Sequence, residues 1–193
     1  MRIAVLASGS GSNFEALLHY CRDHKQGLAT IELLIINNPG CGAQQRAEKY
    51  SIPWLLINHR DFDSRENFDD AILKALQLAK IDLVVLAGWM RIITAKLIDA
   101  FPSGRLLNIH PSLLPEFKGS AAIAAALAAG AKKSGCTVHE VVLNVDAGPI
   151  IAQAEVEIQA SDTLESLKLK IQEQEHLIFA PAIFSKVRQL VYG

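Results

Sequence analysis

Apolar runs and amphipathic segments alternate along the first part of the chain. Continuous apolar runs, typical of strands covered on both faces in a parallel sheet, predict strands at 3–7, 31–36, 54–57, 83–87 and 105–109. Helices are expected between these strands, starting near Phe14, Ala43, Phe68 and Thr94. This order of elements predicts an α/β fold with a Rossmann-like, open, mostly parallel sheet that is flanked by helices.

The last third of the chain has a weaker pattern. An alanine-rich helix is expected at 121–129, and two strands at 135–142 and 150–158 are joined by a short loop. Strands joined in this way predict an antiparallel C-terminal pair at the edge of the sheet.

The C-terminal end is predicted to contain two helices. Asp162, with Glu165 three residues later, resembles a capping box at the start of a long helix, and Pro181 is expected to separate it from a final helix over 182–190. The chain has 193 residues, half of them apolar, which is enough for one substantial core. A single domain over 1–193 is therefore the expectation.

Charge and cysteine content narrow the possible classes of protein. The net charge is -1, and no run of basic residues exceeds Lys132-Lys133, so a nucleic-acid partner is not expected. The three cysteines lie far apart and are interpreted as reduced packing residues of a cytosolic protein, not as a disulfide frame or a zinc site. No apolar run is long enough for a signal segment or a membrane span, so a cytoplasmic protein without a membrane partner is expected.

A glycine-rich turn, residues 8–13 with the sequence Ser-Gly-Ser-Gly-Ser-Asn, joins the first strand to the first helix. Backbone amides at a helix N-terminus, freed from side-chain bulk by glycine, can bind a phosphate or a carboxylate. The alternative is a tight turn capped by Ser12 or Asn13, and both can hold at once. A dinucleotide site is disfavoured, because Phe14 replaces its third glycine and Asn37-Asn38 replace the ribose-binding acid.

Polar residues also follow the fourth and fifth strands. Asn108 and His110 share one face of the fifth strand, which Pro111 prevents from continuing, although a structural histidine and a turn-capping Asn would fit this pattern equally well. Met90 and Arg91 follow the fourth strand and suit a flat ring with polar edges, although Met90 could equally be core. The carboxyl ends of parallel strands share one edge, so these residues and the glycine-rich turn are predicted to line one ligand crevice.

Four segments of the chain, 8–13, 88–93, 108–115 and 145–149, together resemble the phosphoribosylglycinamide formyltransferases of purine synthesis. The resemblance covers nearly the whole chain in order, including Gln-Glu-His at 174–176. The run Asn-Ile-His-Pro-Ser-Leu-Leu-Pro is highly specific for folate-dependent formyl transfer in general, and the glycine-rich turn points to the glycinamide ribonucleotide branch.

The resemblance implies that a formyl group passes from 10-formyltetrahydrofolate, as co-substrate, to the amine of 5'-phosphoribosylglycinamide. It matches Asn108, His110 and Asp146 to a catalytic trio, in which Asn108 and His110 stabilise the oxyanion and His110 with Asp146 moves the proton. Taken alone, Asp146 would more often be a turn-forming residue. No spacing such as His-x-x-x-His indicates a metal ligand set, so no metal is expected.

The binding residues that the resemblance implies fall into two sets. Contacts to phosphoribosylglycinamide are matched by Gly11, Ser12, Asn13, Gln172 and Glu175. Contacts to the folate are matched by Arg65, Met90, Arg91, Ile92, Ile93, Val142 and Asn144. The expected domain then has a phosphate-binding half at 1–100 and a folate-binding and catalytic half at 101–193, with two small-molecule substrates, as a monomer or homodimer.

Two segments depart from the family pattern. Ile123 stands where the family usually has a histidine, in a patch closer to the Gly-Ala-Ala-Pro-Ile of methionyl-tRNA formyltransferases, and Val142 and Leu143 replace acidic residues. Rival functions are formyl transfer to an initiator tRNA or a nucleotide sugar, and formyltetrahydrofolate hydrolysis; the length of the chain is expected to leave no room for their extra domains. A non-catalytic phosphoribosyl or folate sensor is a rival of another class, disfavoured by the intact trio.

Overall fold

The computed structural model describes residues 1–23, 27–102 and 104–193. Within these ranges it forms one sheet with the strand order β3-β2-β1-β4-β5-β6-β7. The strands are β1 (Arg2–Ala7), β2 (Thr30–Ile36), β3 (Trp54–Leu56), β4 (Leu83–Leu86), β5 (Leu106–His110), β6 (Lys133–Glu140) and β7 (Ile150–Glu157). The first five pair in parallel, and β6 and β7 join antiparallel to β5 and to each other. The predicted fold class is confirmed, including the antiparallel C-terminal pair.

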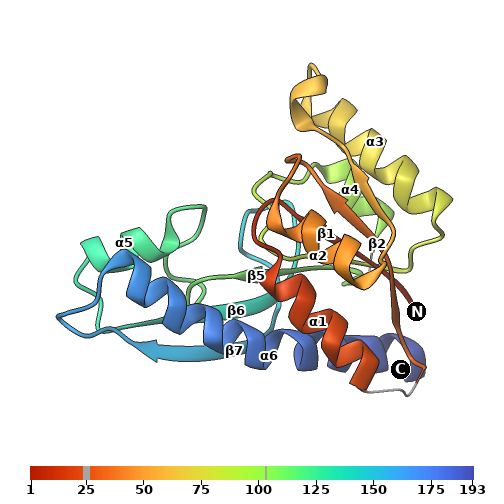
Figure 1. Ribbon diagram of the computed structural model, residues 1–193. Helices are drawn as coiled ribbons and strands as arrows, with labels where there is room; N and C mark the ends of the chain where they lie inside the picture. The colour runs from red at the N-terminus through yellow and green to blue at the C-terminus, as the bar shows by residue number, and fades with distance from the viewer. Residues whose placement is uncertain (24–26, 103) are drawn as a thin grey trace.

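Helices cover both faces of the sheet (Figure 1). They are α1 (Ser12–Asp23), α2 (Gly42–Tyr50), α3 (Arg65–Leu78), α4 (Ala95–Ala100), α5 (Ala122–Ala128) and α6 (Leu164–Tyr192), with a 3₁₀ turn, η1, at His59–Asp61. Helices α1, α2 and α6 pack on one face, and α3 and α4 pack on the other. Strands β1 and β4 are therefore buried on both sides, which explains the continuous apolar runs at 3–7 and in β4.

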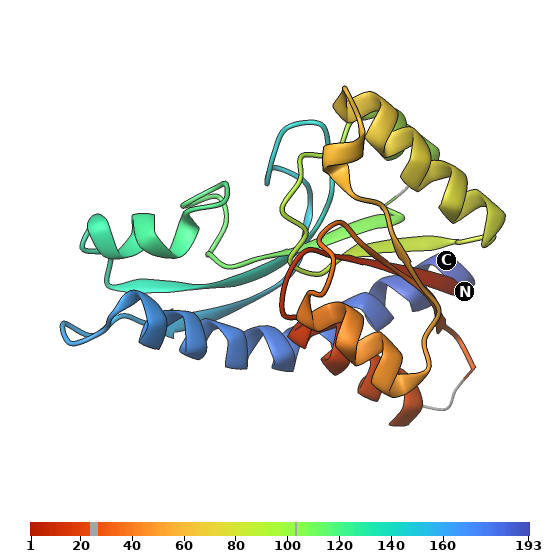
Figure 2. The ribbon, with the colours of Figure 1, turned by 45° about the horizontal axis from the view of Figure 1, so that its top comes forward.

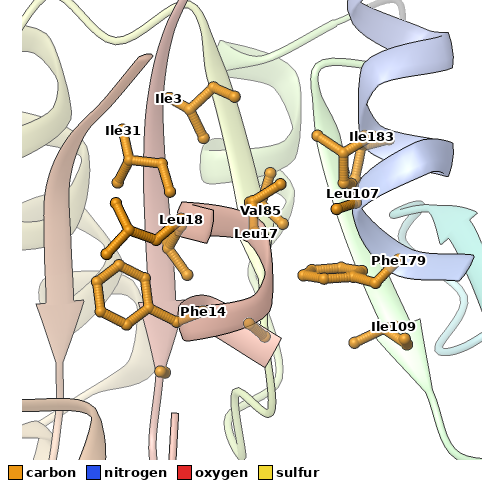
Figure 3. Close-up of a cluster of buried hydrophobic side chains, with 14 of the residues drawn as sticks. Ile3, Phe14, Leu17, Leu18, Ile31, Val85, Leu107, Ile109, Phe179 and Ile183 are labelled. Atoms are coloured by element: carbon orange, nitrogen blue, oxygen red, sulfur yellow. The ribbon is translucent and has the colours of Figure 1, made fainter. Parts of the chain in front are cut away.

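The main core lies between β1, β4 and β5 and the helices α1 and α6 (Figure 3). Phe14 and Leu17 of α1 and Phe179 of α6 are fully buried against Val85 and Leu107 of the strands. Burying one side chain of this size contributes about 1.5–3 kcal/mol, so these contacts fix the place at which α1 and α6 cross the sheet.

Helix α5, strands β6 and β7 and the first half of α6 extend to one side of the molecule (Figure 2). A smaller apolar cluster holds this extension together, with Cys136, Val156, Leu167 and Ile171 buried at its centre. Ile123 of α5 packs against the same cluster. The isoleucine that departs from the family pattern therefore serves to attach α5 to the extension.

Two predictions about the last helix are wrong. Helix α6 runs without a break through Pro181. Apolar residues on both sides of the proline, including Phe179 and Ile183, are fully buried, and their burial outweighs the cost of about 3 kcal/mol for a proline inside a helix. The capping box uses Thr163 and Ser166, not Asp162 and Glu165, because Thr163 is the residue with extended backbone directly before the first helical turn.

Candidate functional site

Three loops meet at the carboxyl edge of the parallel strands. Strands β1, β4 and β5 are neighbours in the sheet, so the segments that follow them leave from the same edge. The first two segments are directly bonded, because the Ser8 amide donates to the Gly88 carbonyl at 3.1 Å and the Met90 amide donates to the Ser8 hydroxyl at 2.9 Å. The predicted common edge is confirmed, and the candidate residues of the first, fourth and fifth strands lie around it.

Asn108, His110 and Asp146 meet at this edge. The His110 Nδ1 lies 3.4 Å from the Asp146 carboxylate, and the side chains of both residues are more than nine-tenths buried. Asp146 adopts a left-handed backbone conformation with φ +50°, and its carboxylate accepts a hydrogen bond of 2.8 Å from the Gly119 amide. The His110 Nε2 is 2.9 Å from the Phe117 carbonyl. Both ring nitrogens of His110 thus face oxygen acceptors.

His139 is a fourth member of the cluster, which the sequence did not reveal. It lies on β6 directly across from Asn108, and its Nε2 is 3.0 Å from the Asn108 amide nitrogen and 3.6 Å from the Asp146 carboxylate. Its Nδ1 lies 2.8 Å from the Glu140 carbonyl, which can only accept, so we assign the ring proton to Nδ1. The Nε2 then accepts a hydrogen bond from one N–H of the Asn108 side-chain amide. This bond fixes the orientation of the amide and leaves its second N–H free for another acceptor.

The charge of His139 is set by its surroundings. Burial lowers the pKa of His139, and this effect outweighs the opposing contributions of the Glu140 carbonyl and of Asp146. A neutral imidazole on this side keeps its acceptor available for the Asn108 amide. The available signal in the sequence is a histidine within the predicted strand at 135–142, and the pairing of β5 with β6 gives it its partner Asn108.

The middle of α6 closes over the glycine-rich turn. The Gln172 amide donates to the Ser12 hydroxyl at 2.6 Å, and the Asn13 amide donates to the Glu175 carboxylate at 2.9 Å. Asn13 is 8% exposed, and its side-chain oxygen has no partner. Burial raises the pKa of Glu175, although the bond from Asn13 opposes that rise. The structure thus gathers the substrate-binding candidates, with Gly11 on the same turn, into one polar group.

Some of the folate candidates follow β4, next to the glycine-rich turn. Arg65 and Arg91 line one pocket of about 190 Å³, together with residues of the segment 59–68. Met90 and Ile92 are 67% and 54% exposed, respectively. Phe68 stacks on the neighbouring Trp89 with ring centroids 6.0 Å apart.

The remaining folate candidates differ in exposure. Ile93 is buried in the core under α3 and α4. Strand β6 ends at Glu140, two residues earlier than predicted, so Val142 and Asn144 lie in the loop between β6 and β7. Val142 is half-buried there, and Asn144 is exposed.

Among the described residues, no group of three or more His, Cys, Asp or Glu side chains could hold a metal ion. In the same part of the chain, no helix is long and apolar enough to cross a membrane.

The arrangement as a whole is that of an acyl-transfer enzyme on a Rossmann-like α/β sheet. An amide and a His–Asp pair surround one point at the edge of the sheet, where they can stabilise an oxyanion and move a proton. The chain belongs to the formyl transferase family, because the sequence model of that family matches residues 1–183.

Similar proteins agree with this assignment. The phosphoribosylglycinamide formyltransferase of Bacillus subtilis is 41% identical over 175 residues, which are 91% of this chain and 89% of that protein. The crystal structure of glycinamide ribonucleotide transformylase 1 from Symbiobacterium toebii superposes with a TM-score of 0.92 at 42% identity, covering 97% of this chain and 89% of that chain. The phosphoribosylglycinamide formyltransferase structure from Bacillus halodurans gives a TM-score of 0.90 at 38% identity, covering 100% and 96%.

Longer relatives also match. The trifunctional purine biosynthetic protein adenosine-3 of Drosophila melanogaster is 47% identical over 183 residues. This match covers 94% of the present chain but only 14% of the length of the Drosophila protein.

Proposed function

We propose that this protein transfers the formyl group of 10-formyltetrahydrofolate to the amine of 5'-phosphoribosylglycinamide. The products are 5'-phosphoribosyl-N-formylglycinamide and tetrahydrofolate, a step of purine (IMP) synthesis. The observation that carries the proposal is the cluster of Asn108, His110 and Asp146 at the carboxyl edge of the sheet, the edge that also holds a polar anion site at Ser12–Gln172 and Asn13–Glu175 and a pocket lined by two arginines. Two substrates that bind along this edge would meet at the trio.

The phosphoribosyl group is assigned to the glycine-rich turn and the middle of α6. Backbone amides of Gly11, Ser12 and Asn13 at the start of α1 can donate to a phosphate, and the positive end of the helix dipole favours its charge. The Glu175 carboxylate can accept hydrogen bonds from ribose hydroxyls. Because the carboxylate is buried, leaving it without such donors would cost free energy.

The folate is assigned to the segment after β4, the pocket at Arg65 and Arg91, and the loop between β6 and β7. The exposed side chains of Met90 and Ile92, with Val142 and Asn144 from the later loop, would cover the pterin ring. Ile93 would support that wall from the core. Arg65 and Arg91 can pair with carboxylates of the glutamyl tail.

The reaction begins when the lone pair of the amine attacks the formyl carbon. A C–N bond forms, and the electrons of the C=O bond move to the formyl oxygen. The Asn108 N–H that does not bond to His139 can donate to this oxyanion, and the buried setting strengthens that bond. Removing one such donor commonly costs about two to three orders of magnitude in rate.

Proton transfer completes the reaction. The attacking nitrogen loses a proton, the oxyanion re-forms the C=O bond, the bond between the formyl carbon and the folate nitrogen breaks, and that nitrogen receives a proton. His110 would donate to the oxyanion and relay the proton from Nε2, in exchange for its contact with the Phe117 carbonyl, while the Asp146 carboxylate faces Nδ1 and orients the ring. All of these steps use side chains of the chain itself, and we propose that the enzyme needs no metal ion.

The proposal extends to the setting in which the enzyme works. Its partners are the two small molecules, without nucleic acid or membrane, and it works in the cytoplasm as a monomer or homodimer. Gel filtration with light scattering distinguishes the two oligomeric states, and activity in EDTA tests the independence from metal.

The decisive test supplies 10-formyltetrahydrofolate with different acceptors. Purified protein is incubated with phosphoribosylglycinamide, with initiator methionyl-tRNA, with a nucleotide amino sugar, or with no acceptor, and tetrahydrofolate release is measured. Rapid release is expected with phosphoribosylglycinamide alone. Release without any acceptor would identify a hydrolase, and absence of turnover with the small amine would refute the proposal.

A further inference from the structure

The carbonyl groups of the glycine-rich turn are held by one neighbouring segment. Three donors from residues 38–46 bond to three successive carbonyls: the Asn38 side chain to Ser8 at 2.8 Å, the Ala43 amide to Gly9 at 3.0 Å, and the Arg46 Nε to Ser10 at 2.9 Å. These contacts join the carboxyl end of β2 and the start of α2 to the turn after β1.

Each of these bonds also orients an amide. In a planar trans peptide, the N–H points opposite to the C=O of the preceding residue. The bond from Arg46 to the Ser10 carbonyl therefore directs the Gly11 N–H to the opposite side of the turn. The Gly11 amide is the first of the three amides assigned to the phosphate. Arg46 therefore orients a donor of the site without contacting the phosphate itself.

The glycine-rich turn and the start of α2 are closely packed against each other. Gly11 has φ +74°, and a Cβ placed on it would lie 2.6 Å from the Ala43 Cα. A Cβ on Gly42 would lie 2.6 Å from the Ser10 carbonyl oxygen. Helices α1 and α2 lie side by side next to the turn (Figures 1 and 2). The start of α2 is thus in direct contact with the backbone that would bind the anion.

The segment also carries charge. The Arg46 guanidinium pairs with the Glu15 carboxylate of α1, and Lys49 of α2 approaches the same carboxylate at 3.6 Å. Arg46 and Lys49 thus share one acid, and of these two cations Arg46 is the one that also bonds to the turn.

We propose that Arg46 is a positioning residue for the substrate phosphate, which aims the Gly11 amide and makes binding depend on the phosphate. This inference rests on the proposed function, since it concerns the same substrate. It assigns a role in recognition to a helix that supplies none of the predicted contacts. The ligand class is a phosphate monoester on a small amine.

The test compares Arg46→Gln with Lys49→Gln as the matched control. Lys49 has the same charge, lies on the same helix and pairs with the same acid, but is 66% exposed in its side chain and makes none of the three bonds to the turn. Each variant is assayed with phosphoribosylglycinamide and with the same amine lacking its 5'-phosphate.

Arg46→Gln is expected to raise KM for the phosphorylated amine by about tenfold or more, the scale of one lost charge-assisted hydrogen bond. Its kcat and its KM for the folate should stay within about twofold of wild type, and KM for the unphosphorylated amine should hardly change, since no aimed bond to a phosphate is lost. Lys49→Gln should leave all values near wild type. Arg46→Lys, which keeps the charge, should recover part of the loss.

Two outcomes would overturn the inference. One is an equal loss for the phosphorylated and unphosphorylated amines, and the other is a loss in Lys49→Gln as large as in Arg46→Gln. Binding of inorganic phosphate, measured by calorimetry on each folded variant, separates this inference from the proposed function because it needs no turnover. Weaker phosphate binding in Arg46→Gln supports the inference even if phosphoribosylglycinamide is not the substrate, and unchanged binding contradicts it.

Discussion

Hydrogen-bond partners determine what each imidazole at the edge of the sheet can do. His139 gives its proton to the Glu140 carbonyl and turns an acceptor toward Asn108. His110 faces an acceptor on either side, the Phe117 carbonyl and the Asp146 carboxylate. The two rings therefore have different roles in the proposed reaction: His139 orients an amide, and His110 carries the mobile proton.

This difference leads to a prediction for His110 and Asp146. His110→Ala and Asp146→Asn are each expected to lower kcat by about two orders of magnitude or more, because each removes a positioned acid–base or oxyanion group. Steady-state kinetics measure the effect, and circular dichroism checks that both variants fold. The control is His19→Ala, an exposed histidine whose ring contacts Tyr50. Near-normal turnover in either variant would remove that residue from the mechanism.

Glu175 allows a prediction of how the free energy of unfolding depends on pH. Burial raises its folded pKa above the unfolded value of about 4.3. The folded state then binds the proton more tightly, so this group stabilises the fold below the unfolded pKa, and its contribution is lost as the pH rises through the folded pKa. Glu175→Gln removes that dependence.

Urea titrations at several pH values test this prediction. The free energy of unfolding of Glu175→Gln should rise relative to wild type as the pH increases from about 4, and then level off above the folded pKa. Glu173→Gln, an exposed neighbour on the same helix, should show no such trend. A difference from wild type that is the same at every pH would contradict the prediction.

At the scale of elements, α6 is the helix that the sequence describes least well. Local rules place a break at Pro181 and a cap at Asp162, whereas the structure has one helix that is capped by Thr163 and Ser166. Asp162 instead accepts hydrogen bonds from Ser166 and Lys170, which, with the Gln159 amide, lower its pKa to about 2. Burial on the sheet decides the path of this helix, and burial by distant strands is not visible in the local sequence.

Pro181 gives a prediction at this scale. Its ring is exposed, and its missing N–H leaves one helical hydrogen bond unmade. Pro181→Ala is therefore expected to raise the free energy of unfolding by about 1 kcal/mol or more, net of the entropy that proline removes from the unfolded chain. Thermal and urea unfolding measure the change. Ser185→Ala, an exposed site one turn later, should change it by about 0.5 kcal/mol or less. A destabilised Pro181→Ala would show that the proline ring itself is needed.

For the whole molecule, much of the architecture could be predicted because it depends on local patterns. Buried strands such as 3–7 and 83–87 are readable from the sequence, and the rules for parallel sheets then place their ends at one edge. Contacts between distant segments could not be read in this way. The bond of His139 to Asn108 needs the pairing of β5 with β6, and the bond of Arg46 to Ser10 needs α2 to pack on the first turn.

Each of the two candidate binding sites draws on both halves of the chain, and the two sets share no residue. Asn13→Leu is therefore expected to raise KM for phosphoribosylglycinamide at least about tenfold, because it removes a polar group that is bonded to Glu175. KM for the folate should change little. Equal weakening of both substrates would contradict the separation of the two sites.

The contacts of Ser12 with Gln172 and of Asn13 with Glu175 have a consequence for how the protein is made. A ribosome makes the glycine-rich turn well before its partners, which lie 160 and 162 residues later in the chain. The candidate phosphate site can therefore close only after α6 has left the exit tunnel and docked on the sheet. A nascent or C-terminally truncated chain would lack this site, so substrate binding reports that synthesis has reached the last helix.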